Sequence, residues 1–272
     1  MAANKLNLNF NVENGSVIKL PKGTTVIKEP LWISDIDNVV IEGQNSTLIY
    51  EGPPCESMVL FERCWKPTFQ DCRLICGSVG VKRGVTLTNK PGSNSATGRV
   101  SSGAKFYDIS IMHGGYPTCV DTGFSIDSFV TGGSEGNNDH HYLEDCYVQS
   151  CKDYCYFING SQCHNLIFER CKGTDAVKRR PIGLYAKHGV FFKYQNGAMN
   201  STSCDFMLGS AEINASIHNF NSEHSNMFIK TLTSNSYTID VDLVRWDGEP
   251  IGNNKIVEMI QSGVISMKNG YF

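Results

Sequence analysis

Between Leu143 and Ile265 the chain repeats a short pattern in which apolar and polar residues alternate. An apolar residue in such a run returns at gaps of 25, 24, 25, 24 and 24 residues, at Leu143, Phe168, Phe192, Ile217, Val241 and Ile265. Alternation with a period of two predicts strands with one buried face. A fixed period in the twenties predicts a solenoid, because each coil buries its apolar face only by stacking on the next. The pattern therefore predicts a β-helix of short parallel strands.

The same pattern continues toward the N-terminus at longer intervals. Counted from Ile41, the gaps to Phe69, Phe106, Leu143 and Phe168 are 28, 37, 37 and 25 residues, so two coils carry insertions. These insertions are residues 89–103 and 131–141. We expect both to rise from one side of the rod and to wall a groove, since loops on a rigid scaffold commonly carry binding groups. The alternative is that they are tolerated insertions without a function.

The main rival fold alternates strands and helices around a parallel sheet. It requires amphipathic stretches of ten or more residues, and every such stretch is interrupted by Gly, Asn or β-branched residues. We therefore predict one all-β domain across 1–272. In this prediction 1–18 form an N-terminal capping strand that shields the first coil, and 19–272 form the coils.

The composition narrows the classes of partner. The 272 residues carry a net charge of −3, and basic residues are scattered apart from 178–180, so we expect no nucleic-acid partner. The sequence has no apolar run long enough to span a membrane, and its first residues lack the apolar core of a signal peptide. We therefore expect no membrane partner, and the 11 cysteines are expected to be free thiols made in a reducing cytoplasm.

The first coils carry a more specific resemblance. Residues 19–27 read Lys-Leu-Pro-Lys-Gly-Thr-Thr-Val-Ile, followed by Asn-Val-Val-Ile-Glu-Gly at 38–43 and Thr-Leu-Ile-Tyr at 47–50. This order resembles the first coils of pectate-lyase-like right-handed β-helices, a superfamily of pectinases, alginate epimerases and lyases, and bacteriophage tailspikes. The resemblance implies a single right-handed parallel β-helix, a pectin-lyase-like solenoid. The chain looks most like the tailspikes, which are made in the cytoplasm without a signal peptide, are rich in thiols and associate as trimers.

Three aspartates, Asp71, Asp108 and Asp145, share one position of the repeat in consecutive coils. Stacked strands would place neighbouring carboxylates ~5 Å apart, which suits a calcium site or the paired carboxylates of a glycoside hydrolase. Asp and Asn also favour turns, and the later coils place Arg170, Tyr194 and Asn219 at this position. A structural turn ladder is the favoured interpretation. No cofactor is required, and Ca²⁺ is the candidate ion of the alternative.

Groups suited to acid–base chemistry gather around the second insertion and one to two coils after it. The candidate catalytic residues are Asp127, Asp139, His140 and Arg179, and the candidate substrate-binding residues are Glu135, Tyr142, Lys178 and Arg180. A lyase needs a base and a cation beside a sugar carboxylate, and a hydrolase needs two carboxylates with different pKa values. A groove that only binds sugar would have the same composition. All three functions therefore remain open.

Two further patterns bear on these alternatives. The triplet Arg179-Arg180-Pro181 resembles the start of the Arg-x-Pro-x-x-Arg stretch of pectate lyases, in which the first Arg is the base, but Leu184 stands at the second Arg position. Six tyrosines flank the second insertion: Tyr142, Tyr147, Tyr154, Tyr156, Tyr185 and Tyr194. Outward rings would suit stacking on sugars, although Tyr is also favoured in strands.

Together these observations favour a virion-associated, tailspike-like protein that binds a polysaccharide or receptor near 89–103 and 121–141, with or without depolymerase activity. The first alternative is a stand-alone polysaccharide lyase or glycoside hydrolase, and the second is a purely structural viral spike or capsid component. The tailspike resemblance implies a homotrimer or contacts with other virion proteins. It also implies location in the virion after synthesis in the host cytoplasm, and the alternative location is the cytoplasm.

Overall fold

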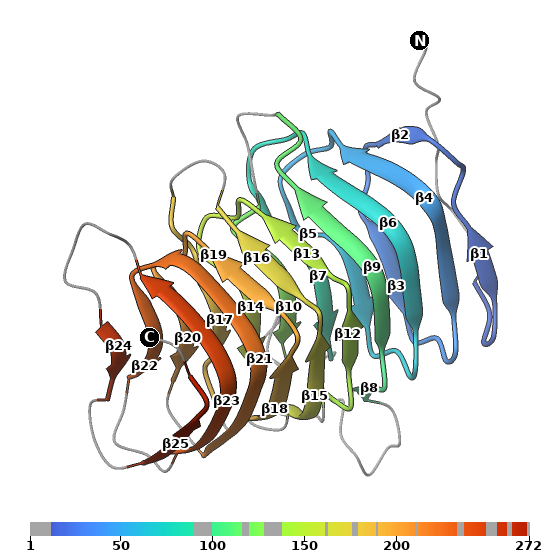
Figure 1. Ribbon diagram of the computed structural model, residues 1–272. Coiled ribbons are helices and arrows are strands. Elements are labelled where there is room, and N and C mark those ends of the chain that lie inside the picture. The colour runs from blue at the N-terminus through green and yellow to red at the C-terminus, as the bar shows by residue number, and fades with distance from the viewer. Residues whose placement is uncertain are drawn as a thin grey trace.

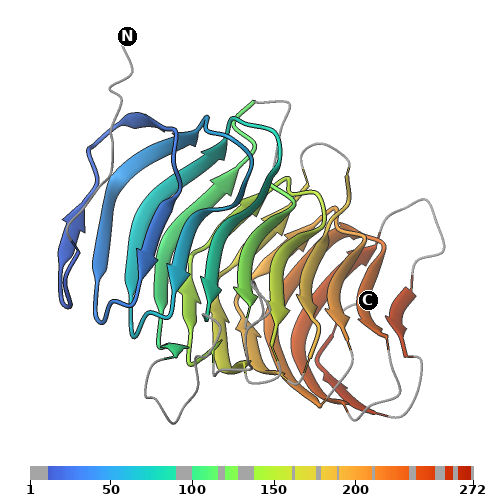
Figure 2. The ribbon, with the colours of Figure 1, turned by 180° about the vertical axis from the view of Figure 1, so that it is seen from behind.

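The chain winds into a right-handed parallel β-helix, as the sequence predicts (Figures 1 and 2). The computed structural model describes residues 12–89, 100–115, 120–127, 138–160, 163–175, 179–188, 190–209, 212–232, 237–248, 255–259 and 263–270. Within these ranges the protein has strands and turns but no helix, and so no helix long and apolar enough to cross a membrane. Most of the predicted capping strand, and most of both insertions, lie outside the described residues.

Two parallel sheets run along the rod. The nine-stranded sheet consists, in spatial order, of β24 (Lys255–Glu258), β22 (Met227–Thr231), β20 (Cys204–Leu208), β17 (Ile182–Ala186), β14 (Tyr154–Asn159), β10 (Thr122–Asp127), β7 (Val81–Thr88), β5 (Cys55–Glu62) and β3 (Leu31–Ser34). The large sheet has 14 strands: β1 (Val17–Lys19), β2 (Thr24–Ile27), β4 (Val40–Tyr50), β6 (Thr68–Cys76), β9 (Lys105–Met112), β12 (Tyr142–Glu144), β13 (Tyr147–Gln149), β15 (Cys163–Glu169), β16 (Lys172–Thr174), β18 (Val190–Gln195), β19 (Ala198–Asn200), β21 (Ile213–Ser225), β23 (Tyr237–Gly248) and β25 (Val264–Lys268). A third, two-stranded sheet pairs β8 (Ser101–Ser102) with β11 (Asn138–Asp139).

The pairing between coils corrects one detail of the predicted repeat. Phe168 pairs with Tyr194, and Tyr194 pairs with Ile217, whereas Phe192 pairs with Leu166. The predicted equivalence of Phe168 with Phe192 is therefore wrong by two residues. A shift of two keeps the side chain on the inner face, so the hydrophobic pattern does not reveal it.

The large sheet bends where one residue per coil takes a left-handed backbone conformation. The bend residues, all with φ between 48° and 56°, are Asp71, Asp108, Asp145, Arg170, Asn196, Asn219, Leu243 and Asn269. Asp and Asn adopt this conformation more readily than most residues, which explains their frequency here. The three aspartates therefore occupy turn positions, and the predicted place of Tyr194 in this series belongs to Asn196.

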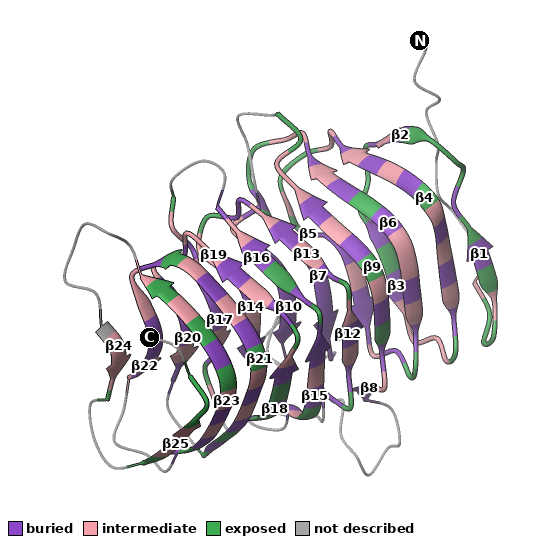
Figure 3. Cartoon of the chain, viewed as in Figure 1, coloured by how far each residue is buried: buried purple, intermediate pink, exposed green. Residues whose placement is uncertain are grey.

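Inward side chains form one aromatic column along the rod. Ring centroids of successive neighbours lie 5.3–5.9 Å apart along Phe61, Phe106, Phe124, Tyr156, Phe168, Tyr194, Phe206 and Phe228. Each such ring contributes about 1.5–3 kcal/mol by burial. The outward orientation considered for the tyrosines is wrong for Tyr156 and Tyr194, whose buried hydroxyls donate to backbone carbonyls. Figure 3 shows the alternation of buried and accessible positions across the large sheet.

The two sheets approach closely through glycines of the nine-stranded sheet. A Cβ at Gly84 would lie 2.6 Å from Ile111 Cδ1, and one at Gly123 would lie 2.6 Å from Cys155 O and from Val148 Cγ1. Only the absence of a side chain admits the aliphatic residues of the facing strands. The ten described cysteines are free thiols, and all but Cys55 are buried, as expected for small residues that fill a core.

Candidate functional site

The outer face of the nine-stranded sheet carries chemistry-bearing side chains in straight columns, because parallel pairing stacks equivalent residues. One column runs Trp32, Leu60, Thr86, Ser125, Phe157 and Tyr185. The next column, at the carboxyl ends of the strands, runs Ser34, Glu62, Thr88, Asp127 and Asn159. Figure 2 shows the molecule from the side of this sheet.

Three aromatic rings form a platform on this face. The Tyr154 and Phe157 ring centroids lie 5.0 Å apart, and Tyr185 lies 5.3 Å from Tyr154 and 5.6 Å from Phe157. All three rings are half-buried, so each also presents surface to solvent. Burial raises the pKa of the Tyr154 and Tyr185 hydroxyls, which therefore remain protonated donors at neutral pH.

A buried polar cluster lies beside the platform. Arg83 Nη2 lies 3.1 Å from Asp127 Oδ2, and Asn159 Nδ2 donates to Asp127 Oδ1 at 3.1 Å. Arg83 is five residues before Thr88, the register partner of Asp127. Its side chain therefore extends along the strands, past the level of Thr86 and Ser125, to reach that carboxylate.

Several hydrogen-bonding groups of this cluster have no partner within the described part of the chain. They are Arg83 Nη1, Thr86 Oγ1, Ser125 Oγ and Asn159 Oδ1, and each atom is buried. A buried polar group without a partner costs about 1–3 kcal/mol. These four atoms are closed to solvent, so ordered water inside the protein suits them better than a ligand that arrives at the surface.

Asp139 is the last residue of β11 and His140 follows it; both are predicted catalytic residues. Asp139 accepts a 2.6 Å hydrogen bond from Ser102 Oγ, and His140 Nδ1 lies 3.1 Å from Asp139 Oδ1. The neighbouring His141, which the sequence analysis did not single out, is fully buried, and burial lowers its pKa to about 3. It is therefore neutral, and it bonds the side chain of Asn138 and the backbone N–H of Ala104.

Arg179 and Arg180 lie in the turn between β16 and β17, at the amino ends of the nine-stranded sheet. The Arg180 backbone N–H donates to Asp175 Oδ2 and its Nη1 donates to Asn226 Oδ1, both at 2.5 Å. These arginines and Asp127 therefore flank the same face from opposite strand ends. Glu135 and Lys178 lie outside the described residues.

Tyr142 lies elsewhere, on the outer face of the large sheet. Its ring is 5.9 Å from that of Tyr107. Burial, followed by its hydrogen bond with Glu144, raises its pKa to about 12. The structure therefore groups Asp127, Asp139 and His140 around one corner of the nine-stranded sheet, places Arg179 and Arg180 at the opposite corner, and separates Tyr142 from both.

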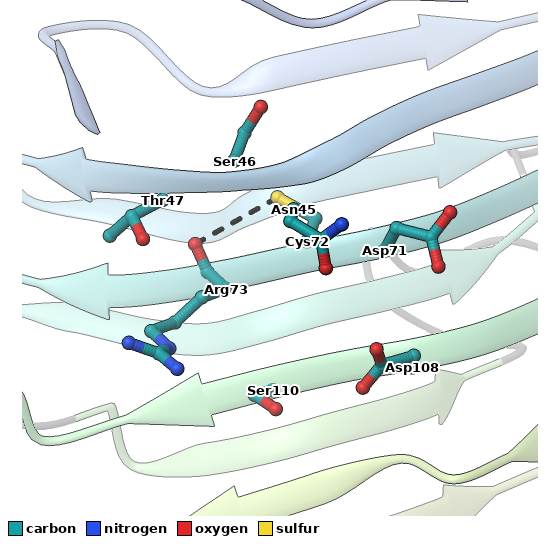
Figure 4. Close-up of a pocket in the computed structure, with 8 residues that line it drawn as sticks. All are labelled: Asn45, Ser46, Thr47, Asp71, Cys72, Arg73, Asp108 and Ser110. Atoms are coloured by element: carbon teal, nitrogen blue, oxygen red, sulfur yellow. Dashed lines mark hydrogen bonds between the residues drawn. The ribbon is translucent and has the colours of Figure 1, made fainter. Parts of the chain in front are cut away.

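A shallow pocket of about 140 Å³ marks the bend of the large sheet (Figure 4). Asp71 and Asp108 line it from neighbouring strands together with Arg73, while Asp145 pairs with Arg170 at 2.9 Å. Among the described residues, His, Cys, Asp and Glu side chains form no group of three or more placed to hold a metal ion. Ca²⁺ therefore stays a prediction, and the aspartates are accounted for by the turn.

Comparison with known proteins is informative for the fold. No protein-family model matches the chain, and the curated proteins contain no significant match. Among solved structures, the endo-xylogalacturonan hydrolase of Aspergillus tubingensis aligns with a TM-score of 0.58 and 10% identity, over 94% of this chain and 84% of its own. At this identity the similarity supports the parallel β-helix fold and no more.

Two weaker structural matches are the GH136 lacto-N-biosidase of Eubacterium ramulus and the surface protein and adhesin PfbA of Streptococcus pneumoniae. The first has a TM-score of 0.47 and 11% identity over 90% of this chain and 51% of its own. The second has a TM-score of 0.44 and 8% identity over 93% of this chain and 91% of its own.

Proposed function

We propose that the protein binds a polysaccharide on the outer face of its nine-stranded sheet. One observation carries the proposal: the rings of Tyr154, Phe157 and Tyr185 form a platform on this face, and each ring keeps part of its surface open to solvent. The xylogalacturonan hydrolase with the same fold is by its name a polysaccharide-processing enzyme, which is consistent with this proposal.

The chemistry of the face suits a sugar better than a lipid or a nucleic acid. Aromatic rings with polar edges pack on the apolar faces of pyranose rings, while fixed polar groups bond the sugar hydroxyls. Arg83 is paired with Asp127, so the cluster has no strong net charge toward a ligand. An uncharged ligand with many hydroxyl groups satisfies both parts of the face.

Binding to a panel of purified plant, bacterial and algal polysaccharides tests the proposal. We expect Tyr185→Ala to weaken the affinity for the bound glycan about tenfold, the equivalent of about 1.4 kcal/mol. The matched control is Tyr107→Ala, which removes the same side chain from the large sheet. Equal losses in both variants, or no binding to any glycan by the wild-type protein, would contradict the proposal.

Hydrolysis is a second candidate function, favoured by two buried carboxylates in one column. Glu62 and Asp127 are 8% and 1% exposed and stand on β5 and β10, with β7 between them. Two strand steps separate their backbones by about 10 Å, which brings the carboxyl groups near the separation of inverting glycosidases. Release of reducing ends that disappears in Glu62→Gln and Asp127→Asn would support hydrolysis, and release of unsaturated sugars would support a lyase instead.

The finer form of the proposal is a virion-associated receptor-binding role in a homotrimer. The described cysteines are free thiols, which suits synthesis in a reducing compartment without secretion. Analytical ultracentrifugation of the purified chain tests the trimer directly. A stable monomer at micromolar concentration would remove this form of the proposal and leave polysaccharide binding in place.

A further inference from the structure

The side chain of His141 connects the bases of the two insertions through a chain of hydrogen bonds. Its Nδ1 accepts from the backbone N–H of Ala104 at 3.1 Å, and its Nε2 lies 2.7 Å from Asn138 Oδ1. Asn138 Nδ2 in turn donates to the carbonyl oxygen of Leu87 at 3.0 Å. Leu87 precedes the first insertion and Ala104 follows it, while the other two residues belong to the second. One imidazole therefore ties both insertions to the strands of the β-helix.

This arrangement accepts only one protonation state of the ring. Because Ala104 presents an N–H, Nδ1 of His141 carries no proton, and the single ring proton is on Nε2, where it is donated to Asn138. The bond to Leu87 holds the Asn138 amide with its oxygen toward the ring. A second proton, on Nδ1, would face the Ala104 N–H, donor against donor, and that bond would be lost. The residue is only 1% exposed, so water does not solvate the resulting charge.

The charged groups around the ring do little to stabilise a second proton. Asp139 favours the charge and His140 opposes it, but the Asp139 carboxylate already accepts from Ser102 Oγ and lies 3.1 Å from His140 Nδ1. Ionisable side chains on the neighbouring strands and turns are Lys66, Arg83, Lys105, Asp127, Cys163 and His164. The one carboxylate in this group pairs with the arginine, and both lysines are exposed. Burial therefore dominates, and it lowers the pKa of His141 to about 3.

We propose that His141 is a pH-sensitive latch, which holds the bases of the two insertions together while its ring is neutral and releases them when the ring takes a proton from solvent. The corner of the nine-stranded sheet that contains Asp139 and His140 therefore loosens in acid. This latch does not depend on polysaccharide binding. A released ring has the ordinary pKa of 6.5, so the released population is constant well above this pH and grows about tenfold per pH unit below it. The growth ends near pH 3, where the latched ring also takes a proton.

Hydrogen exchange of the Ala104 N–H, followed by NMR, tests the latch, because this amide is protected while it donates to His141. Its protection factor, which corrects for the intrinsic pH dependence of exchange, should fall about fiftyfold between pH 6.5 and 4.5. The Lys172 N–H donates to the carbonyl oxygen of Cys146 and serves as the reference amide. Ala104 should be less protected than Lys172 at every pH. Equal protection of the two amides would show that the whole fold opens together, and constant protection at Ala104 would show that no proton is taken up on opening; either result would overturn the latch.

Two matched variants identify the group that takes the proton. His141→Gln keeps a neutral side chain with one acceptor and one donor, so its Ala104 protection should stay constant between pH 6.5 and 4.5. His113→Gln removes another imidazole, directly after β9, and should keep the fiftyfold fall of the wild type. A fall that persists in His141→Gln would assign the proton to a different group and overturn the proposal. If that variant does not fold, the comparison of Ala104 with Lys172 in the wild type and in His113→Gln still decides.

Discussion

Asp205 provides a direct test of how much a buried ionisable side chain lowers the stability of this β-helix. The side chain is fully buried in β20 and accepts hydrogen bonds from Ser222 Oγ and Thr202 Oγ1. Burial raises its pKa to about 6, because the desolvated carboxylate is penalised more than the hydroxyl donors stabilise it. An Asp205→Asn substitution keeps the shape and removes the ionisation.

The magnitude follows from the size of the shift. The pKa rises from an ordinary value of 3.8 to about 6, and each unit corresponds to about 1.4 kcal/mol, so ionised Asp205 costs on the order of 3 kcal/mol. Because the folded state holds the proton more tightly than the unfolded state, the stabilisation is complete below about pH 4 and is lost as the pH rises through 6. Above that pH the stabilisation is absent.

Equilibrium denaturation of wild type and Asp205→Asn at intervals between pH 4.5 and 8 measures this effect, since titrations common to both proteins cancel in the difference. We expect the variant to gain about 2 kcal/mol relative to wild type between pH 4.5 and 8, with most of the gain below pH 6 and a plateau above it. A difference that does not change with pH would show that Asp205 titrates normally. The reasoning about its desolvation would then be refuted.

Three further substitutions test the backbone and the face. Leu243→Asn should stabilise the protein by about 1 kcal/mol, because Leu243 is 55% exposed at a bend with φ 53°; a fall in the melting temperature would contradict this. Gly123→Ala should cost about 1–3 kcal/mol in denaturation, since its Cβ would meet Val148 Cγ1 of the large sheet at 2.6 Å, and an unchanged stability would show that the sheets can separate there. Asp127→Asn should cost about 3 kcal/mol by leaving Arg83 unpaired, and the loss should shrink in a double variant with Arg83→Met; an undiminished loss would contradict the pairing.

The hydrophobic pattern was sufficient to predict the fold but not its register. Period-two alternation and a repeat of twenty-odd residues predict a stack of parallel strands. They do not determine which residues of neighbouring strands pair. Phe192 and Tyr194 both point inward, so the sequence alone cannot choose between them as the partner of Phe168. The step from Phe168 to Tyr194 takes 26 residues and the next step, from Tyr194 to Ile217, takes 23, so an assumption of nearly equal coils misses the partner by two residues.

The candidate site was harder to predict because its contacts join distant segments. Asp127 precedes the second insertion and could be singled out as an acidic residue, but its partner Arg83 lies 44 residues earlier, in the neighbouring strand β7. His140 and His141 are adjacent, and only the structure separates the exposed ring from the buried one. Tyr142 was grouped with the site because it follows the insertion, yet the chain has already turned onto the large sheet there.

The aromatic platform has its origin in the packing of the core. Strict alternation would place Tyr154 and Phe157 on opposite faces, but the two residues between them, Cys155 and Tyr156, are both buried. The equivalent pair in β17 is Gly183 and Leu184, with Ile182 and Tyr185 outward. The small inward residue of each pair, Cys155 or Gly183, lets the facing strand approach. Because two consecutive residues point inward, the residues on either side of the pair both lie on the outer face. The close approach of the sheets therefore creates the paired outward positions, so that substitutions which push the sheets apart should also disperse the rings that we propose bind sugar.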